Sequence, residues 1–401
     1  MSMQNFQDDS ETTEAGGAGE IPCAMATVVK TTGSAYRRPG ARMFLYADGR
    51  REGSISGGCL EADVAERALK TLRTNQPIYV MYDTSGANGD VFFETGCNGA
   101  IGILIEPLTN RNAARCVKWI AECQKRRRPA VVATVYRVFG DCGAELGSRF
   151  LLHESGEIET DISSPTLRDE LLAEAQTLLD APKAANQTVA LANGGVKVLL
   201  EKLRPPVQLL ICGAGQDAIP LAQSAAALGW QAVIADHREA FLTAERFPAP
   251  AALIATRPEN LFADFTPDAR TVAVIMTHHA GQDRVYLRLL LASDAAYIGL
   301  LGPKRRGECL LNELRGEGFH PKLKQLARLR SPAGLDIGAE TPEEIAIALI
   351  AEIQAALTNR PGGALRERSG PIHVLPESLT FSAEAPLREE NAEGFSCPLS
   401  A

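Results

Sequence analysis

Two cysteines in the first half of the chain lie in glycine-rich segments. Cys59 follows Gly57 and Gly58 in GSISGGCLEADV, and Cys97 lies in the segment Gly-Cys-Asn-Gly at 96–99. Glycines keep the backbone open, and a helix that starts near Cys59 would stabilise its thiolate form through free N–H groups. Two such thiols, neither in a CxxC pair, indicate soft-metal or sulfur chemistry rather than structural zinc. The alternative is that both are small hydrophobic residues buried at tight turns.

A basic loop is a candidate anion site. The segment TTGSAYRRPGARM places Tyr36, Arg37 and Arg38 between glycines that predict a loop joining two strands. Arginine guanidinium groups bind phosphate through paired hydrogen bonds, so this loop has the chemistry of an anion site. An ordinary solvated basic loop remains the alternative.

A glycine pattern in the second half predicts a phosphate loop. Gly213, Gly215 and Ala218 follow a predicted strand and open a predicted helix, and the next strand ends at Asp236. The first glycine permits a tight turn, the second lets the backbone approach a phosphate, and an acidic residue at this distance can bind ribose hydroxyls. Asp217 argues against phosphate, because a carboxylate near the helix start would repel it. Glycines that serve packing alone are the other interpretation.

Further polar residues follow the later strands. His278 and His279 come directly after the strand TVAVIM, where ligands sit in open parallel sheets, and Asp283 is positioned to orient one of them. The simpler interpretation is that one of these histidines makes a structural hydrogen bond and takes no part in catalysis. Thr341 and Glu344 form a capping box that predicts a helix start. The loop 334–338 before this helix is expected to close over the cleft at the carboxyl ends of the strands, where His278 and His279 lie.

The second half shows a regular alternation of strands and helices. The expected strands are 207–211, 231–235, 252–255, 271–276 and 297–301. One expected helix ends at Leu228, a second spans 282–292, and two more begin at Lys304 and at Pro342. This alternation predicts βαβ units and a Rossmann-type doubly wound parallel sheet.

The first half is expected to form an α/β domain of another type. Its expected strands are 24–30, 42–47, 78–82, 100–106 and 130–138, and its expected helices are 60–74, 112–127 and 165–180. The predicted divisions of the chain are a disordered tail at 1–20, a first domain at 21–203, a Rossmann-type domain at 204–357 and a loosely ordered tail at 358–401.

Composition narrows the class of protein. The 401 residues include 45% hydrophobic and 22% charged residues, with a formal net charge of −8 and a pI near 5.5. This balance favours small-molecule work and argues against nucleic acid as the main partner. An odd count of nine cysteines without dense spacing, and no apolar run of membrane-spanning length, indicate a soluble protein of the cytoplasm. Cys116, Cys123 and Cys212 are expected in hydrophobic cores.

Six blocks in order resemble the XdhC/CoxI family, the accessory factors of xanthine dehydrogenase and related molybdenum hydroxylases. The blocks are GSAYRRPGARM, DGRREGSISGGCLEADV, LLICGAGQDAIPLA, VIMTHHAGQD, YIGLLGPKRR and SPAGLDIGAETPEEIAIALIAEI. The resemblance runs from about residue 24 to 355, and is only one of general layout at 107–205. One departure from the family pattern is Asn98, which replaces a glycine after Cys97.

The resemblance implies a non-catalytic carrier. Such proteins bind molybdenum cofactor (molybdopterin), help a cysteine desulfurase supply its terminal sulfur, and deliver it to the apo-enzyme of a molybdenum hydroxylase. They are homodimers with an N-terminal XdhC/CoxI-type domain and a C-terminal Rossmann-type domain. Carried over by motif, the thiols near the cofactor and its metal are Cys59 and Cys97, with the loop of Arg37 and Arg38 beside them. The glycine loop would face the phosphate or nucleotide part of the cofactor. The candidate cofactor-binding residues are these two thiols and two arginines together with Gly57, Gly58, Gly213, Gly215, Asp236 and His278.

Two other functions stay open on the residues alone. An NAD(P)-dependent oxidoreductase would use the glycine loop and Asp236, although a hydride-transfer pair such as Tyr-x-x-x-Lys is not recognisable. A nucleotide-responsive regulator or assembly scaffold would need a partner surface that one sequence does not reveal.

Overall fold

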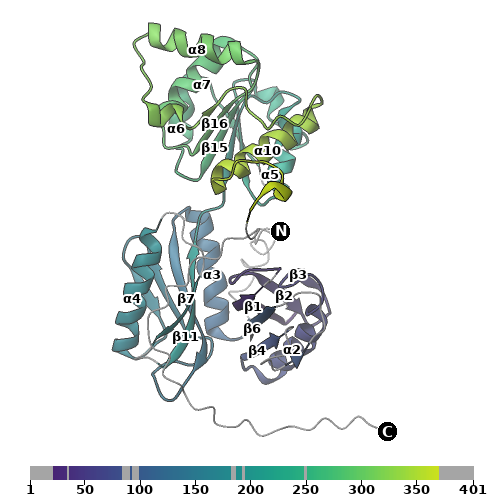
Figure 1. Ribbon diagram of the computed structural model, residues 1–401, viewed down its shortest axis with the longest axis vertical. Helices are drawn as coiled ribbons and strands as arrows, with labels where there is room; N and C mark the ends of the chain where they lie inside the picture. The colour runs from purple at the N-terminus through teal and green to yellow at the C-terminus, as the bar shows by residue number, and fades with distance from the viewer. Residues whose placement is uncertain are drawn as a thin grey trace.

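The computed structural model describes residues 21–33, 36–83, 91–92, 99–181, 187–191, 195–247 and 251–369. These residues form three sheets, each covered by helices (Figure 1). The expected tail at 1–20, Cys97, and residues 370–401 of the expected C-terminal tail lie outside the described residues.

The first sheet is built around the long strand β1. Its elements are β1 (Cys23–Gly33), β2 (Arg42–Tyr46), β3 (Arg51–Gly53), α2 (Glu61–Thr74), β4 (Ile78–Asp83), β5 (Val91–Phe92) and β6 (Gly99–Pro107). The strand order is β3-β2-β1-β6-β4-β5, antiparallel except for the parallel pair β4 and β5. The first seven residues of β1 are buried because this central strand is covered on both faces. Helix α2 packs Val64 and Ala68 against the sheet at helical spacing.

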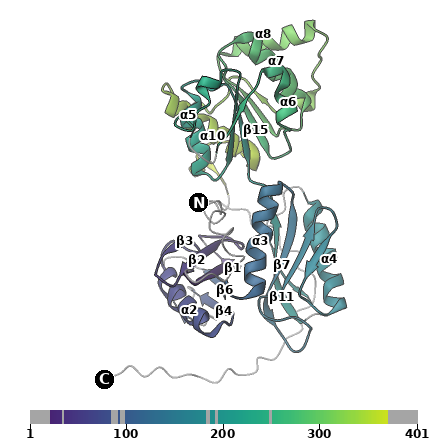
Figure 2. The same cartoon turned by 180° about the vertical axis from the view of Figure 1, so that it is seen from behind.

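The second sheet is antiparallel and separate from the first. Its elements are α3 (Arg111–Arg126), β7 (Ala130–Val138), β8 (Arg149–His153), β9 (Ile158–Thr160), α4 (Pro165–Asp180), β10 (Gln187–Leu191) and β11 (Val196–Leu203), in the strand order β10-β11-β7-β8-β9. Helix α4 covers one face, and α3 lies between the two sheets in both views (Figure 2). Cys116 and Cys123 of α3 lie in this core, as the sequence predicts.

Two buried ion pairs join the first and second sheets. Arg42 of β2 contacts Glu201 of β11 at 2.6 Å, and Arg149 of β8 contacts Glu106 of β6 at 2.6 Å. Each pair takes one partner from each sheet, so separating the sheets would leave buried charges without partners. Residues 21–203, for which the sequence predicts one domain, therefore contain two sheets packed as one unit.

The third sheet is parallel and doubly wound, as predicted. Its elements are β12 (Gln208–Cys212), α5 (Ala218–Ala227), β13 (Gln231–Asp236), β14 (Ala252–Ala255), α6 (Leu261–Asp264), β15 (Thr271–Ile275), α7 (Ala280–Ala292), β16 (Tyr297–Leu300), α8 (Lys304–Gly316), α9 (Leu323–Leu326), β17 (Leu329–Arg330) and α10 (Pro342–Thr358). The strand order is β14-β13-β12-β15-β16-β17. Helices α5 and α10 cover one face, while α6, α7 and α8 cover the other. Cys212 is buried in the second of these cores, as expected.

Local signals explain where α10 begins. The Thr341 hydroxyl accepts a hydrogen bond from the Glu344 N–H, and the Glu344 carboxylate accepts one from the Thr341 N–H. This is the predicted capping box, which satisfies N–H groups that lack partners within the helix. The expected closing loop at 334–338 packs on α10: the Gly334 N–H donates to Glu352, and the Leu335 N–H donates to the Ala348 carbonyl.

A short linker precedes the third sheet, and Arg127 connects this sheet to the rest of the fold. Arg127, which ends α3, donates hydrogen bonds to both carboxylate oxygens of Asp268, to the Pro206 carbonyl and to the Gln231 side chain. These acceptors belong to the linker and the third sheet, so one side chain connects two parts of the fold. Among the described helices, none is both long and apolar enough to cross a membrane.

Candidate functional site

The Cys59 loop, defined as residues 54–60, presents an exposed thiol just before α2. Cys59 is exposed, and its Sγ lies 3.7 Å from the Ser56 Oγ. The same hydroxyl oxygen accepts hydrogen bonds from the N–H groups of Gly58 and Leu60, at 3.2 and 3.3 Å. Gly58 has a φ of +109°, which favours glycine at this position. Cys59 is therefore not a small hydrophobic residue buried at a tight turn, which was the alternative for both cysteines, and Cys97 lies outside the described residues.

The Glu61 carboxylate fixes the shape of this loop. It accepts hydrogen bonds from the Ser56 N–H at 2.9 Å, from the Ser56 hydroxyl, and from the Leu60 N–H at 3.2 Å. Partial burial raises the pKa of Glu61, but these hydrogen bonds outweigh burial and hold its pKa below the ordinary value. The N–H groups at the helix start are thus used within the loop, and the thiol stays on the outside.

The basic loop lies against the Cys59 loop. A Cβ placed on Gly57 would lie 3.9 Å from the Tyr36 ring, and the Arg37 guanidinium lies 5.6 Å from the centre of that ring. Within the described residues, Arg37 and Arg38 form no ion pair and remain exposed. The Cys59 loop and the basic loop are therefore neighbours, joined where Gly57 faces Tyr36.

The Cys59 loop offers one thiol rather than a cage of metal ligands. In the described part of the chain, no group of three or more histidine, cysteine or acidic residues could hold a metal ion, and Cys97 lies outside that part. A single exposed sulfur suits a metal that already carries another strong ligand, as the dithiolene of molybdopterin provides. The open backbone and the unpaired arginines also fit the phosphate of that cofactor.

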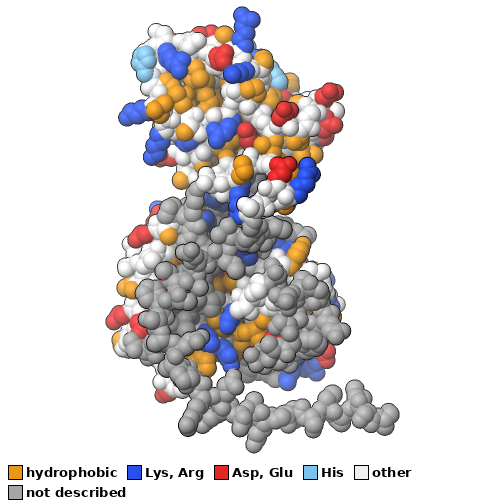
Figure 3. Space-filling view, viewed as in Figure 1, with side chains coloured by type: hydrophobic (Ala, Val, Ile, Leu, Met, Phe, Trp, Pro, Cys, Tyr) orange, Lys and Arg blue, Asp and Glu red, His pale blue; other side chains and the backbone are white. Residues whose placement is uncertain are grey.

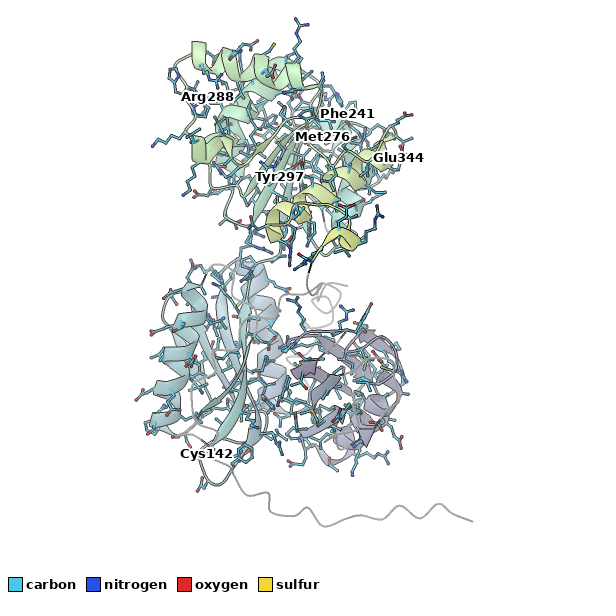
Figure 4. The ribbon with its side chains drawn as sticks, viewed as in Figure 1. Cys142, Phe241, Met276, Arg288, Tyr297 and Glu344 are labelled. Carbon is cyan, nitrogen blue, oxygen red and sulfur yellow. The ribbon has the colours of Figure 1, made fainter. Side chains whose placement is uncertain are left out.

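The glycine loop, defined as residues 213–217, is shaped by its neighbours. Gly213 has a φ of +114°, and a Cβ there would lie 2.8 Å from the Met276 carbonyl oxygen. The first glycine therefore serves both a tight turn and a close approach to the end of β15. Figure 4 labels Met276, which directly follows β15, and Phe241, which follows β13, both in the part of the molecule that contains the third sheet.

Asp236 is held inside the fold. It is 3% exposed, its Oδ2 accepts the Ala214 N–H at 2.8 Å, and both of its oxygens accept hydrogen bonds from Arg238. Burial raises its pKa, but the Arg238 side chain and the two backbone N–H groups lower it to about 2 overall. The residue expected to bind ribose hydroxyls therefore has both oxygens engaged within the protein, one of them by the glycine loop.

A histidine–aspartate pair covers the start of α5. His278 Nε2 lies 2.8 Å from Asp217 Oδ2, and a Cβ on Gly215 would lie 2.6 Å from Asp217 Oδ1. His278 has a φ of +59°, an uncommon backbone conformation for a residue with a side chain. The Asp217 carboxylate thus lies where the helix start would otherwise offer N–H groups to an anion, and His278 is its partner.

The expected role of Asp283 is wrong. Its carboxylate contacts the Thr277 hydroxyl and the Arg306 guanidinium, with the Arg306 Nε at 3.1 Å, instead of a histidine ring. His279 instead accepts the Gln282 N–H through Nδ1 at the start of α7, as a structural hydrogen bond. Asp283 is 1% exposed, so an arginine partner stabilises its charge better than an exposed imidazole would.

Sequence reasoning missed a stack of side chains next to the glycine loop. The guanidinium groups of Arg238 and Arg246 lie 4.2 and 4.9 Å from the centre of the Phe241 ring. Arg246 also donates hydrogen bonds to the carbonyls of Ala214 and Gly215, at 3.0 and 3.3 Å. The spacing HREAFLTAER has no helical or strand period, so only the fold reveals that these cations meet.

The two candidate surfaces are apart within one chain. The third sheet lies at one end of the molecule and α2 toward the opposite end in both views (Figures 1 and 2). The resemblance implied that the glycine loop faces the phosphate or nucleotide part of the ligand held near Cys59. In a single chain these two elements are not side by side.

Comparison with known proteins places this arrangement in a family. The model of the "XdhC and CoxI family" matches residues 18–83 and 123–191, and the model of the "XdhC Rossmann domain" matches 209–353. A relative from Bacillus subtilis, named as a probable subunit of xanthine dehydrogenase, is 32% identical over 82% of this chain and 91% of its own length. The chain belongs to the XdhC and CoxI family.

Other relatives agree with this assignment. The molybdenum cofactor insertion chaperone PaoD of Escherichia coli is 23% identical over 82% of this chain and 81% of its own length. A crystal structure of a xanthine dehydrogenase from Bacillus halodurans superposes with a TM-score of 0.68 at 27% identity, covering 90% of this chain and 97% of that one. The matched segment 123–191 lies in the region where the sequence blocks show only a general likeness.

Proposed function

We propose that this XdhC/CoxI-family protein binds molybdenum cofactor at the Cys59 loop and carries it to the apo-enzyme of a xanthine dehydrogenase-type molybdenum hydroxylase. The exposed Cys59 thiol is the observation that carries the proposal, in a loop where Gly57 lies against Tyr36 of the basic loop. The names of two relatives, one a probable part of xanthine dehydrogenase and the other a cofactor insertion chaperone, support it.

The chemistry of a carrier agrees with the Cys59 loop. A carrier must hold its ligand reversibly and leave the metal accessible, so one sulfur on an open surface serves better than a closed cage. In the proposed function a cysteine desulfurase reaches the bound cofactor and supplies its terminal sulfur before delivery. The proposal further includes a homodimer that works in the cytoplasm.

The first prediction concerns retention of the cofactor. Protein isolated anaerobically from cells that make the cofactor is expected to contain molybdenum and a phosphorylated pterin. Cys59→Ser should lower the retained molybdenum by about tenfold or more, because the thiol is the soft ligand of the site. Elemental analysis and pterin fluorescence measure both components.

Cys309 provides the matched control, because it is also exposed but lies on α8, a helix that covers the third sheet. Cys309→Ser should retain as much molybdenum as the wild type, and loaded protein should protect Cys59, but not Cys309, from alkylation. Absence of both molybdenum and pterin from the wild type would refute the proposed function. Full retention by Cys59→Ser would remove this thiol from it.

An NAD(P)-dependent oxidoreductase is the second candidate function. The parallel sheet and the glycine loop favour it, whereas the engaged oxygens of Asp236 and the carboxylate of Asp217 at the helix start oppose it. Calorimetric titration with NADH and NADPH tests it. Saturable binding together with turnover of a carbonyl substrate would replace the carrier proposal.

A further inference from the structure

Three cations meet where the first and second sheets join. They are Lys30 of β1, Arg137 of β7 and Lys197 of β11, here called the cationic cluster. Burial lowers the pKa of Lys197, and the nearby charges of Lys30 and Arg137 lower it further. In the part of the chain that the structure describes, none of the three forms an ion pair. Among the described residues, no carboxylate therefore offsets their positive charge.

A β-bulge precedes or adjoins each cation. The register of β1 against β6 shifts between Val28 and Lys30, and the register of β11 against β7 shifts between Lys197 and Val198, where it passes over Tyr136. The two extra residues, Val29 and Tyr136, pack in one core cluster between the sheets. Bulges of this kind re-aim the side chains that follow them and occur next to functional sites. Here two bulges direct cations from two sheets to one place.

Aromatic rings line the same cluster. The Arg137 guanidinium lies 5.6 Å from the centre of the Tyr79 ring and 5.5 Å from that of Phe139, and the Lys197 ammonium lies 5.6 Å from Phe139. Phe139 is 40% exposed. A Cβ on Gly102 would lie 2.6 Å from the Tyr79 hydroxyl, so this glycine makes room for the ring.

The arrangement costs stability. Arg137 and Lys197 are directly opposite on neighbouring strands, where like charges repel. Neither is shielded by a carboxylate within the described residues, and Figure 3 shows lysine and arginine side chains beside hydrophobic ones at the boundary of the two lower lobes. An anion that bound there would relieve the repulsion.

We propose that the cationic cluster binds the phosphate group of a planar heterocyclic ligand. This inference rests on the proposed function, in which that ligand is the pterin of the molybdenum cofactor. Cations supply the charge that a phosphate needs, and the exposed ring of Phe139 supplies a face for a heterocycle. If the ligand were instead the acidic surface of another protein, it would contact the cations but would not contact the recessed ring of Tyr79.

The position of β1 connects this cluster with the Cys59 loop. From Lys30 the strand continues for three residues to Gly33, about 10 Å at the usual rise of a strand. The loop that follows brings Tyr36 against Gly57. The phosphate site is therefore at the end of β1 that leads to the thiol.

The test compares a phosphorylated pterin, obtained by oxidising molybdenum cofactor, with the same pterin after phosphatase treatment. Fluorescence titration of the full chain should show tighter binding of the phosphorylated form, weakening as salt concentration rises. Lys197→Gln and Arg137→Gln should each weaken binding of the phosphorylated form by about tenfold and leave the other form unchanged. Lys197→Arg, which keeps the charge, should bind as the wild type does.

Lys324→Gln is the control, because it removes an exposed cation from α9 in the third part. Loss of folding is not expected in the cluster variants, since each removes a like-charge repulsion, and thermal unfolding checks this. Equal binding of both pterins by wild type and variants would overturn the phosphate site, while the Cys59 result could still support the proposed function. Weaker binding of both pterin forms by the cluster variants would also overturn it.

Discussion

At the residue scale, both candidate loops depend on a carboxylate that accepts backbone N–H groups. Glu61 holds the Cys59 loop through Ser56, and Asp236 holds the glycine loop through Ala214. Both have a pKa below the ordinary value because hydrogen bonds favour the charged form more than burial disfavours it. Acidic residues near the two sites therefore serve to position other groups.

Asp236→Asn tests this role through the pH dependence of stability. The folded-state pKa of Asp236 is about 2, below its ordinary value of 3.8, so its charge stabilises the fold above about pH 4. That contribution is lost as the pH falls from about 4 to 2. The variant should be less stable by about 2 kcal/mol at pH 7, and the difference should narrow between pH 4 and 3. Urea unfolding at several pH values measures it.

The exposed Asp264 on α6 provides the comparison. Asp264→Asn should leave the free energy of unfolding nearly unchanged at every pH. A loss for Asp236→Asn that is the same at pH 7 and pH 3 would show that packing, rather than the charge, accounts for its contribution.

Local patterns in the sequence predicted the helices and strands that depend mainly on neighbouring residues. Strands β12 to β16 of the third sheet and the capping box of α10 appear where expected, because alternating strands and helices carry strong local signals. The short strand β17 was not predicted. The division of 21–203 into two sheets was not predicted, since β1 pairs with β6 and β7 with β11 across long stretches of chain. The contact of His278 with Asp217 and the cationic cluster depend on the same non-local pairing, so spacing alone does not reveal them.

Two glycines test how tightly the glycine loop is packed. Gly213→Ala would add a Cβ 2.8 Å from the Met276 carbonyl oxygen at a φ of +114°, so it should destabilise the fold by about 2 kcal/mol or more. Gly316→Ala in α8 has nothing within 4 Å of the added Cβ and should stabilise by about 0.5–1 kcal/mol. Chemical denaturation measures both. A neutral Gly213→Ala would contradict the close approach of β12 and β15.

At the scale of the whole molecule, the connections between the three sheets differ in kind. The first and second sheets share two buried arginine–glutamate pairs and the helix α3, so they are expected to move and unfold together. The third sheet is tied to them by the linker and by Arg127, whose ion pair with Asp268 is partly exposed. For the proposed carrier, this difference predicts that the third sheet reorients without disturbing the Cys59 loop.

Arg127→Gly tests whether this side chain fixes the third sheet. Arg127 has a φ of +51°, so glycine removes the side chain without straining the end of α3. Loss of its hydrogen bonds should lower the coupling between the two parts by about 2 kcal/mol. Scanning calorimetry should then show two separated transitions, and small-angle X-ray scattering should show a larger radius of gyration.

Arg127→Lys should restore the coupling between the two parts only in part, because an ammonium group cannot contact Asp268, Pro206 and Gln231 together. The neighbouring Arg126 is exposed and only weakly paired with Glu122, so Arg126→Ala should behave like the wild type. If Arg127→Gly kept one transition and the original dimensions, the linker alone would hold the third sheet in place, and the proposed reorientation would have no support.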